Sequence, residues 1–110
     1  MKKRYFAVLL ILSVILIGLI GCNPDTEGKT YNIWYDGNGN DGGFPPVDNN
    51  HYTAGQIAYV KGTNTLYKND RDFLNWNTKQ QGDGVSYHED DPITVKNISI
   101  RLYAIWGKLP

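Results

Sequence analysis

The sequence of 110 residues has one cysteine, two histidines and no excess of positive charge. A single thiol excludes an internal disulfide, so the fold must be stable without one. The histidines, His51 and His88, have no cysteine or further histidine at the spacing of a zinc site, and we expect both on the surface. A nucleic-acid-binding protein would carry a basic stripe, so no nucleic-acid partner is expected.

Recognisable catalytic motifs are missing as well. No Gly-x-Ser-x-Gly pattern sets up a serine as a nucleophile. The acidic cluster Glu89–Asp91 is typical of a solvated turn. Paired catalytic carboxylates must face each other across a cleft, and a chain this short has little room for one. We therefore expect neither an enzyme nor a bound cofactor.

Alternating oxygen-bearing residues follow the first predicted strand. Asp36, Asn38 and Asn40 match the start of an EF-hand loop, which then requires glycine at its sixth position and glutamate at its twelfth. Those two positions hold Asp41 and Val47 here. The sequence therefore predicts a plain turn and no metal, with a different calcium site at Asp36 and Asp41 as the alternative.

The start of the chain has the pattern of an export signal. Residues 2–4 are basic, residues 5–20 are almost entirely apolar, and the run ends in Leu19-Ile20-Gly21-Cys22. A charged head, an apolar middle and a small residue before the cleavage site define such signals. The alternative is a membrane-spanning helix, which needs about 20 apolar residues. The ending resembles the lipobox of bacterial lipoproteins, in which Leu19, Ile20 and Gly21 form the signal-peptidase recognition sequence.

The lipobox resemblance implies that residues 1–21 are a signal peptide and that Cys22 carries diacylglycerol, with an acylated amine. Membrane lipid is then a partner, because two or more acyl chains anchor a protein stably. Residues 22–30 are expected to be a short tether. Asn23 differs from the aspartate that retains some lipoproteins at an inner membrane, which favours an exported protein at the outer membrane or cell surface. Loss of three basic residues leaves eight against eleven acidic ones, so the mature net charge is near −3.

The rest of the chain is predicted to be mainly β. Apolar and polar residues alternate as in strands, and no segment shows a sustained helical period. The expected strands are 31–35, 56–61, 73–77, 85–87, 93–95 and 98–106. Glycine and asparagine dominate 35–43, which predicts a tight turn because both tolerate positive φ. We expect a loop over 61–72, with at most one helical turn near Leu66, and further turns at 80–84 and 89–92.

Aromatic residues are expected to fill the core, since each contributes about 1.5–3 kcal/mol when buried. This prediction covers Trp34, Trp76 and Trp106, with Phe73 also directed inward. In the last strand one face carries Ile98, Ile100, Leu102, Ala104 and Trp106. Rings that point outward would instead be candidates for stacking on sugars. These candidates are Tyr31, Trp34, Tyr35, Tyr59 and Tyr103.

Four motifs follow one another along the chain. They are Tyr35-Asp36-Gly37-Asn38-Gly39-Asn40, Phe73-x-x-Trp76-Asn77-Thr78, Gly82-x-Gly84 followed by Ser86-Tyr87, and Leu102-Tyr103-Ala104-x-Trp106. Their order resembles the Listeria-Bacteroides repeat of bacterial surface proteins, similar to the B-repeat of internalin B. The resemblance runs from about Tyr31 to Trp106. It implies a single β-grasp-like module of about 75 residues within 31–107.

The family resemblance also implies a non-catalytic role, in adhesion or as a spacer, with a surface protein as partner. The family usually has an aromatic residue and a glycine where this chain has Arg71 and Asn75. The chain also carries one copy, so avidity from linked copies cannot operate within it. A glycan-binding module and an envelope-anchored inhibitor of another enzyme are the alternatives.

Overall fold

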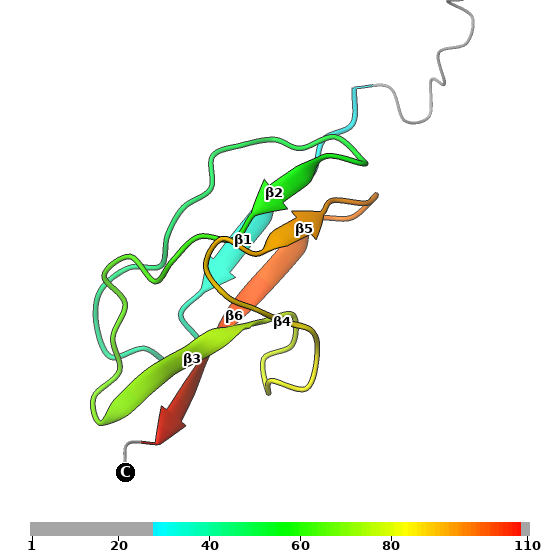
Figure 1. Cartoon of the computed structure of the whole chain (residues 1–110). Coiled ribbons are helices and arrows are strands. Elements are labelled where there is room, and N and C mark those ends of the chain that lie inside the picture. Colours follow the sequence, from blue (N-terminus) through cyan, green and yellow to red (C-terminus); the bar gives the residue numbers. More distant parts are fainter. Residues whose placement is uncertain (1–27, 109–110) are drawn as a thin grey trace, which may run out of the picture.

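The computed structural model describes residues 28–108, where six β-strands and no helix are found (Figure 1). No segment within this range therefore forms a helix able to span a membrane. The predicted mainly β class is confirmed. The predicted signal peptide, the lipidation residue Cys22 and tether residues 22–27 lie outside the described residues.

The larger sheet has four strands in the order β1, β6, β3, β4. The first strand, β1 (Ile33–Asp36), is parallel to the last, β6 (Ile100–Lys108). On the other side of β6 lies β3 (Arg71–Asn77), which is antiparallel to it and to the short β4 (Ser86–Tyr87). The long final strand therefore holds the two halves of the chain together.

The second sheet is an antiparallel pair, β2 (Ile57–Tyr59) and β5 (Pro92–Thr94). Each strand has three residues, and its middle residue, Ala58 or Ile93, is buried while its flanking residues are exposed. Side chains alternate across a strand, so this pattern directs one residue of each strand into the core. The pair forms a second layer beside β1 and β6 (Figure 1).

Four aromatic rings form a continuous row through the core. Tyr35 meets Trp76 edge to face with ring centroids 4.9 Å apart, Trp76 meets Phe73 at 5.1 Å, and Phe73 meets Trp106 at 5.8 Å. Edge-to-face pairs add about 0.5–1.5 kcal/mol each beyond their burial. The burial expected of Trp76 is confirmed, while Phe73 and Trp106 are half-buried against the core.

The predicted glycine-asparagine turn is present and is attached to β6. Asn38 and Gly39 have φ of 51° and 84°. The Asn38 side-chain amide donates to the Ala104 carbonyl at 2.8 Å, and the Trp106 indole N–H donates to the Gly37 carbonyl at 2.9 Å. The first motif, in the turn after β1, and the last motif, in β6, therefore hold one another in place.

Several strand boundaries differ from the predictions. β1 begins at Ile33, because Tyr31 pairs with Tyr52 in an isolated bridge outside the sheet. β6 begins at Ile100, and Ile98 is exposed rather than in the core. No helical turn forms near Leu66, which is buried directly before an isolated bridge.

Candidate functional site

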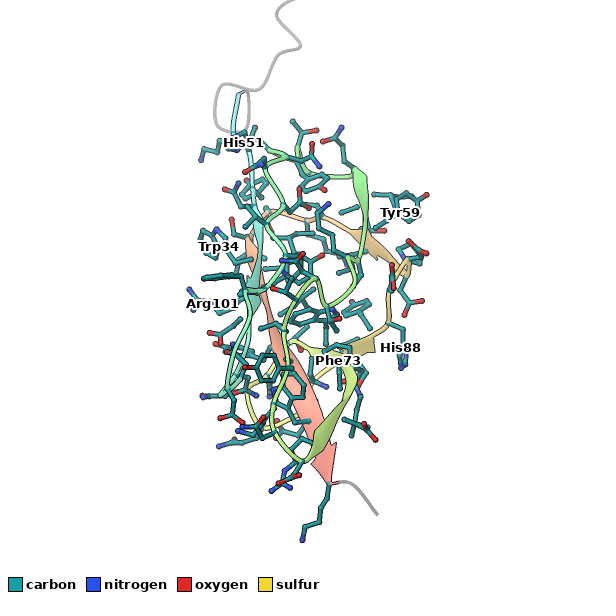
Figure 2. All side chains as sticks on the ribbon, turned by 90° about the vertical axis from the view of Figure 1, so that its left-hand side faces the viewer. Trp34, His51, Tyr59, Phe73, His88 and Arg101 are labelled. Atoms are coloured by element: carbon teal, nitrogen blue, oxygen red, sulfur yellow. The ribbon has the colours of Figure 1, made fainter. Side chains whose placement is uncertain are left out.

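The face of the larger sheet that points away from β2 and β5 is here called the outer face. Its residues on β1 and β6 include Trp34, Asp36, Arg101 and Tyr103, and the strand register pairs Trp34 with Arg101 and Asp36 with Tyr103. Figure 2 shows Trp34 and Arg101 together on the side of the molecule opposite Tyr59. The outer face is therefore separate from the core.

The prediction that Trp34 belongs to the core is wrong. Its neighbours Ile33 and Tyr35 are buried, so the alternation of a strand turns Trp34 to the opposite face, where its side chain is 52% exposed. Single exposed apolar side chains are common on protein surfaces, so the meaning of Trp34 depends on the residues beside it.

Arg101 is held beside Trp34 by two contacts. The guanidinium carbon lies 5.6 Å from the centroid of the Trp34 ring, within cation–π range. A guanidinium nitrogen lies 3.5 Å from the Asp36 carboxylate. Both charged side chains are partly exposed, so the ion pair adds little stability. Its effect is to orient the Arg101 side chain along the tryptophan.

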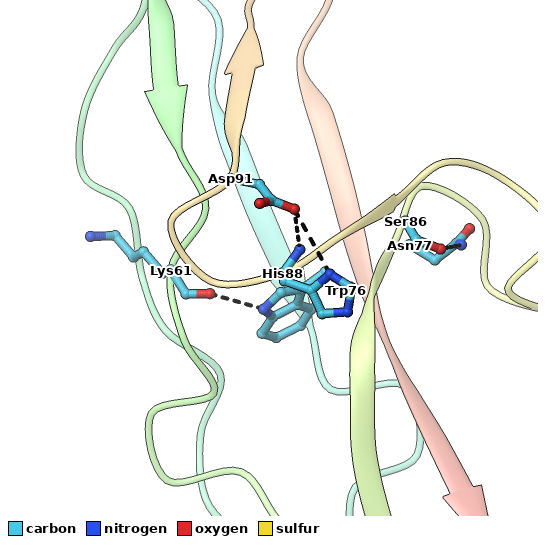
Figure 3. Close-up of polar contacts among 6 residues, drawn as sticks. All are labelled: Lys61, Trp76, Asn77, Ser86, His88 and Asp91. Atoms are coloured by element: carbon cyan, nitrogen blue, oxygen red, sulfur yellow. Dashed lines mark hydrogen bonds and ion pairs between the residues drawn. The ribbon is translucent and has the colours of Figure 1, made fainter.

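The other end of the outer face is covered by the loop 78–84. The buried Asn77 side chain accepts hydrogen bonds from the Lys79 and Gly84 backbone N–H groups, both at 2.9 Å. Its amide donates to the Gly82 carbonyl and to the Ser86 hydroxyl, the second of which is drawn in Figure 3. This network folds the loop over β3 and β4, so the accessible part of the outer face is its β1 end.

A pocket of about 330 Å³ lies along the free edge of β1. It separates the strand from the segment 45–51, and its lining residues are Asn32, Ile33, Trp34, Tyr35, Pro45, Pro46, Val47, Asp48, Asn49 and His51. Small-molecule sites occupy pockets of about 300–1,000 Å³. The pocket is therefore at the lower end of the size range for a ligand.

A buried carboxylate lies at the far wall of this pocket. Asp48 accepts hydrogen bonds from the Asn50 backbone N–H at 2.9 Å and from the Tyr52 hydroxyl at 2.7 Å. Burial raises the pKa of the Tyr52 phenol, and its hydrogen bond to Asp48 raises this pKa further. Tyr52 therefore keeps its proton and holds the carboxylate in place.

The structure separates the proposed sugar-stacking rings. Trp34 and Tyr59 are exposed, but on opposite sides of the molecule (Figure 2). Tyr31 and Tyr103 are half-buried. The expectation that Tyr35 could point outward is wrong, because Tyr35 faces the core and its hydroxyl accepts from the Lys61 N–H at 2.9 Å. The five rings form no common platform.

The histidine and metal predictions concern His51, His88, Asp36 and Asp41. His51 and His88 are both exposed, as expected. Asp36 accepts from the Asn38 N–H and Asp41 accepts from the Asn69 N–H, as in ordinary turns. Among residues 28–108 no three histidine, cysteine or acidic residues lie close enough to hold a metal ion.

The family-motif residues are brought together, but mostly in the core. The register pairs Tyr35 with Leu102, Trp76 with Ala104, and Phe73 with Trp106. Trp76 also donates its indole N–H to the Lys61 carbonyl at 2.9 Å (Figure 3). These residues therefore build the sheet, while the motif residues Asp36, Asn77, Ser86 and Tyr103 lie on its outer face.

Two bacterial proteins are similar to part of this chain. A protein of Evansella cellulosilytica, named as a membrane protein, is 32% identical over 79 residues, which are 72% of this chain and 12% of that protein. A second protein of the same organism, named as a glycine-rich membrane protein, is 30% identical over 76 residues, 69% of this chain and 9% of its own length. No family model and no solved structure matches the chain.

The matched segment is thus a small part of much longer relatives. A chain that corresponds to about a tenth of a relative shares one module with it. The similarity therefore concerns this module, and the remainder of each relative has no counterpart in this alignment.

The sequence did not predict the segment 45–51 as part of a site. Its Pro45-Pro46 pair favours extended or turn backbone over helix and indicates no ligand. Strand alternation places Arg101 on the face of the last strand opposite Leu102 and Ala104, whereas Trp34 was expected in the core, with an outward position as the sugar-stacking alternative. The pairing of β1 with β6 brings the two residues together on one face of the sheet.

Proposed function

We propose that this protein is a non-catalytic, lipid-anchored module of the cell envelope that binds a partner protein through the β1 end of its outer face. The lipobox at Leu19–Cys22 supports the anchor. The names of the two relatives as membrane proteins support a membrane association. The proposal includes membership of the Listeria-Bacteroides repeats, supported by the convergence of the four sequence motifs on one sheet.

One observation carries the choice of surface. Trp34 is half exposed on a sheet face, and Arg101 is held along its ring by Asp36. Tryptophan and arginine, together with tyrosine, are the residues most enriched among those that dominate binding energy in protein interfaces. An arginine that is already oriented loses less side-chain entropy when a partner binds. The Trp34–Arg101 pair therefore has the residue types of an interface anchor, and its arginine is already held in a fixed orientation.

Photo-crosslinking in intact cells tests the surface. A photoreactive benzoylphenylalanine replaces Trp34 in one variant and Tyr59 in another, because both side chains are exposed and they lie on opposite sides. We expect a discrete crosslinked protein with the probe at position 34 and none with the probe at position 59. Equal products from both positions, or none from either, would contradict binding through the outer face.

Metabolic labelling tests the anchor separately. A palmitate analogue should label the wild-type chain and fail to label Cys22→Ala, because the acyl chains are attached to the residue at that position. The same cells should release Cys22→Ala from the membrane fraction. Labelling of both chains would contradict the lipoprotein assignment without affecting the surface.

Glycan binding is the second candidate, because Trp34 stands beside a pocket with polar residues Asn32, Asn49 and His51. An indole face supplies stacking and the amides supply hydrogen bonds, the usual elements of a sugar site. A glycan array probed with the detergent-purified full chain and with Trp34→Ala tests this function. Binding by the wild type that is lost in the variant would favour it over a protein partner.

A further inference from the structure

The edge of β1 that faces the pocket has free backbone groups. β1 is the outermost strand of its sheet. The Asn32 carbonyl accepts from the Ile100 N–H at 2.9 Å, so the backbone at Asn32 points toward β6. Backbone N–H and C=O groups change direction at each residue of a strand. The backbone groups of Trp34, two residues after Asn32, therefore also point toward β6. The backbone groups of Ile33 and Tyr35 therefore point to the opposite, unpaired edge.

A ladder begins on this free edge and then stops. Tyr31 and Tyr52 exchange two backbone hydrogen bonds, at 2.7 and 2.9 Å. If that antiparallel pairing continued, Asn50 would lie opposite Ile33. Instead the Asp48 carboxylate binds the Asn50 N–H and turns the chain away. Among residues 28–108 the N–H and C=O groups of Ile33 have no hydrogen bond to this diverging segment.

The segment 45–47, here called the strap, covers the free edge without pairing with it. Pro45 and Pro46 have no N–H group, so the strap cannot donate to a strand at those positions. Within the described part of the chain its backbone forms no hydrogen bond. It is fixed only at its ends, where Phe44 bonds to the Thr65 hydroxyl and Asp48 bonds to Tyr52. The pocket lies between the strap and β1.

We propose that the free edge of β1 binds a short, extended, basic peptide, which adds to the sheet as an antiparallel strand at Ile33 and Tyr35. Addition of a strand to an exposed sheet edge is a common mode of peptide recognition. This inference goes beyond the proposed function, because it depends neither on the lipid anchor nor on the Trp34–Arg101 pair.

Charge selects the peptide. The residues that line the pocket include the Asp48 carboxylate and contain no lysine or arginine. A positively charged side chain is therefore favoured beside this wall, and a negatively charged one is disfavoured. The peptide residue that lies between those paired with Ile33 and Tyr35 would direct its side chain to the outer face, next to Trp34.

The strap must move outward for the peptide to enter. Ile33 is only 1% exposed, whereas the strap residue Val47 is 71% exposed and has no hydrogen bond to restrain it within the described structure. The competing explanation is that the strap only protects an edge strand from aggregation, as proline-rich covers do. Under that explanation no peptide reaches the backbone of Ile33.

The test uses the full chain in detergent micelles and a peptide of alternating valine and lysine. We expect saturable binding, with amide exchange slowed about tenfold or more at Ile33 and Tyr35 and unchanged at Trp34, whose amide is already in the ladder with β6. A matched peptide with glutamate in place of lysine should bind at least about tenfold more weakly.

Two N-methylated peptides supply the sharpest control without altering the protein. Methyl groups on one alternate set of peptide nitrogens remove the hydrogen bonds to β1 and should weaken binding about tenfold or more. Methyl groups on the other set point away from the edge and should change affinity less than about threefold. Absence of binding, equal effects of both methylations, unchanged exchange at Ile33, or binding of a glycan alone would overturn the proposal.

Discussion

Replacement of Trp76 by alanine should unfold the domain or bring it close to unfolding. The Trp76 side chain has no exposed surface, packs edge to face on Tyr35 and Phe73, and donates to the Lys61 carbonyl. Truncation of a buried tryptophan costs about 3–5 kcal/mol. Loss of the hydrogen bond adds about 1 kcal/mol. Domains of this size have about 5 kcal/mol of stability or little more, so these losses remove most of it.

Urea unfolding followed by circular dichroism measures this loss. Trp34→Ala is the matched control, because it makes the same chemical change at a half-exposed position and should cost only about 1 kcal/mol, mainly through loss of the contact with Arg101. Trp76→Phe keeps an aromatic ring but loses the N–H donor, so it should fall between the two and remain folded enough to measure. Equal midpoints for the substitutions at positions 34 and 76 would refute the assignment of the two rings.

Three other predictions use the same unfolding assay. Gly43→Ala should destabilise by more than about 2 kcal/mol, because at its φ of 78° the new Cβ would lie 1.9 Å from the Thr65 carbonyl oxygen. Gly55→Ala is the control: its Cβ meets no atom within 4 Å, so it should cost only about 1 kcal/mol. Equal costs would contradict the close approach at Gly43. Asn77→Ala should cost about 2–4 kcal/mol by freeing the loop, and a wild-type midpoint would refute this. Burial raises the pKa of the Tyr35 phenol above 10.0, so stability is full below pH 10 and falls as the pH rises through the native pKa; Tyr35→Phe should lessen that fall, and an identical pH profile would argue against it.

Strand alternation predicted the buried face better than residue type did. In β1, Ile33 and Tyr35 are separated by one residue, and both are buried. The error at Trp34 arose because its size and apolar character were given more weight than its position between Ile33 and Tyr35 in the same strand. In a strand of four residues the direction of a side chain is fixed by its neighbours, so the exposed tryptophan follows from the alternation itself.

The strand boundaries and the pocket were less predictable for a different reason. The boundary of β1 depends on Tyr52, which pairs with Tyr31 from a distant part of the chain. The pocket depends on Asp48, whose side chain competes with that pairing by binding the Asn50 N–H. Local competition of this kind is a known property of aspartate. Its outcome, however, depends on where Tyr52 lies in the fold, and a sequence pattern does not contain that information.

The position of the family motifs explains why they indicate a fold and leave the ligand open. Tyr35, Phe73, Trp76 and Trp106 contact one another in a single row, and the Asn38 turn is bonded to the strand that carries Trp106. These contacts stabilise the sheet independently of what the protein binds. Recognition would instead depend on the residues between the motifs, which include Trp34, the strap and Arg101. Proteins that share the motifs can therefore bind different partners, because changes at the outer face and at the edge of β1 leave the core row intact.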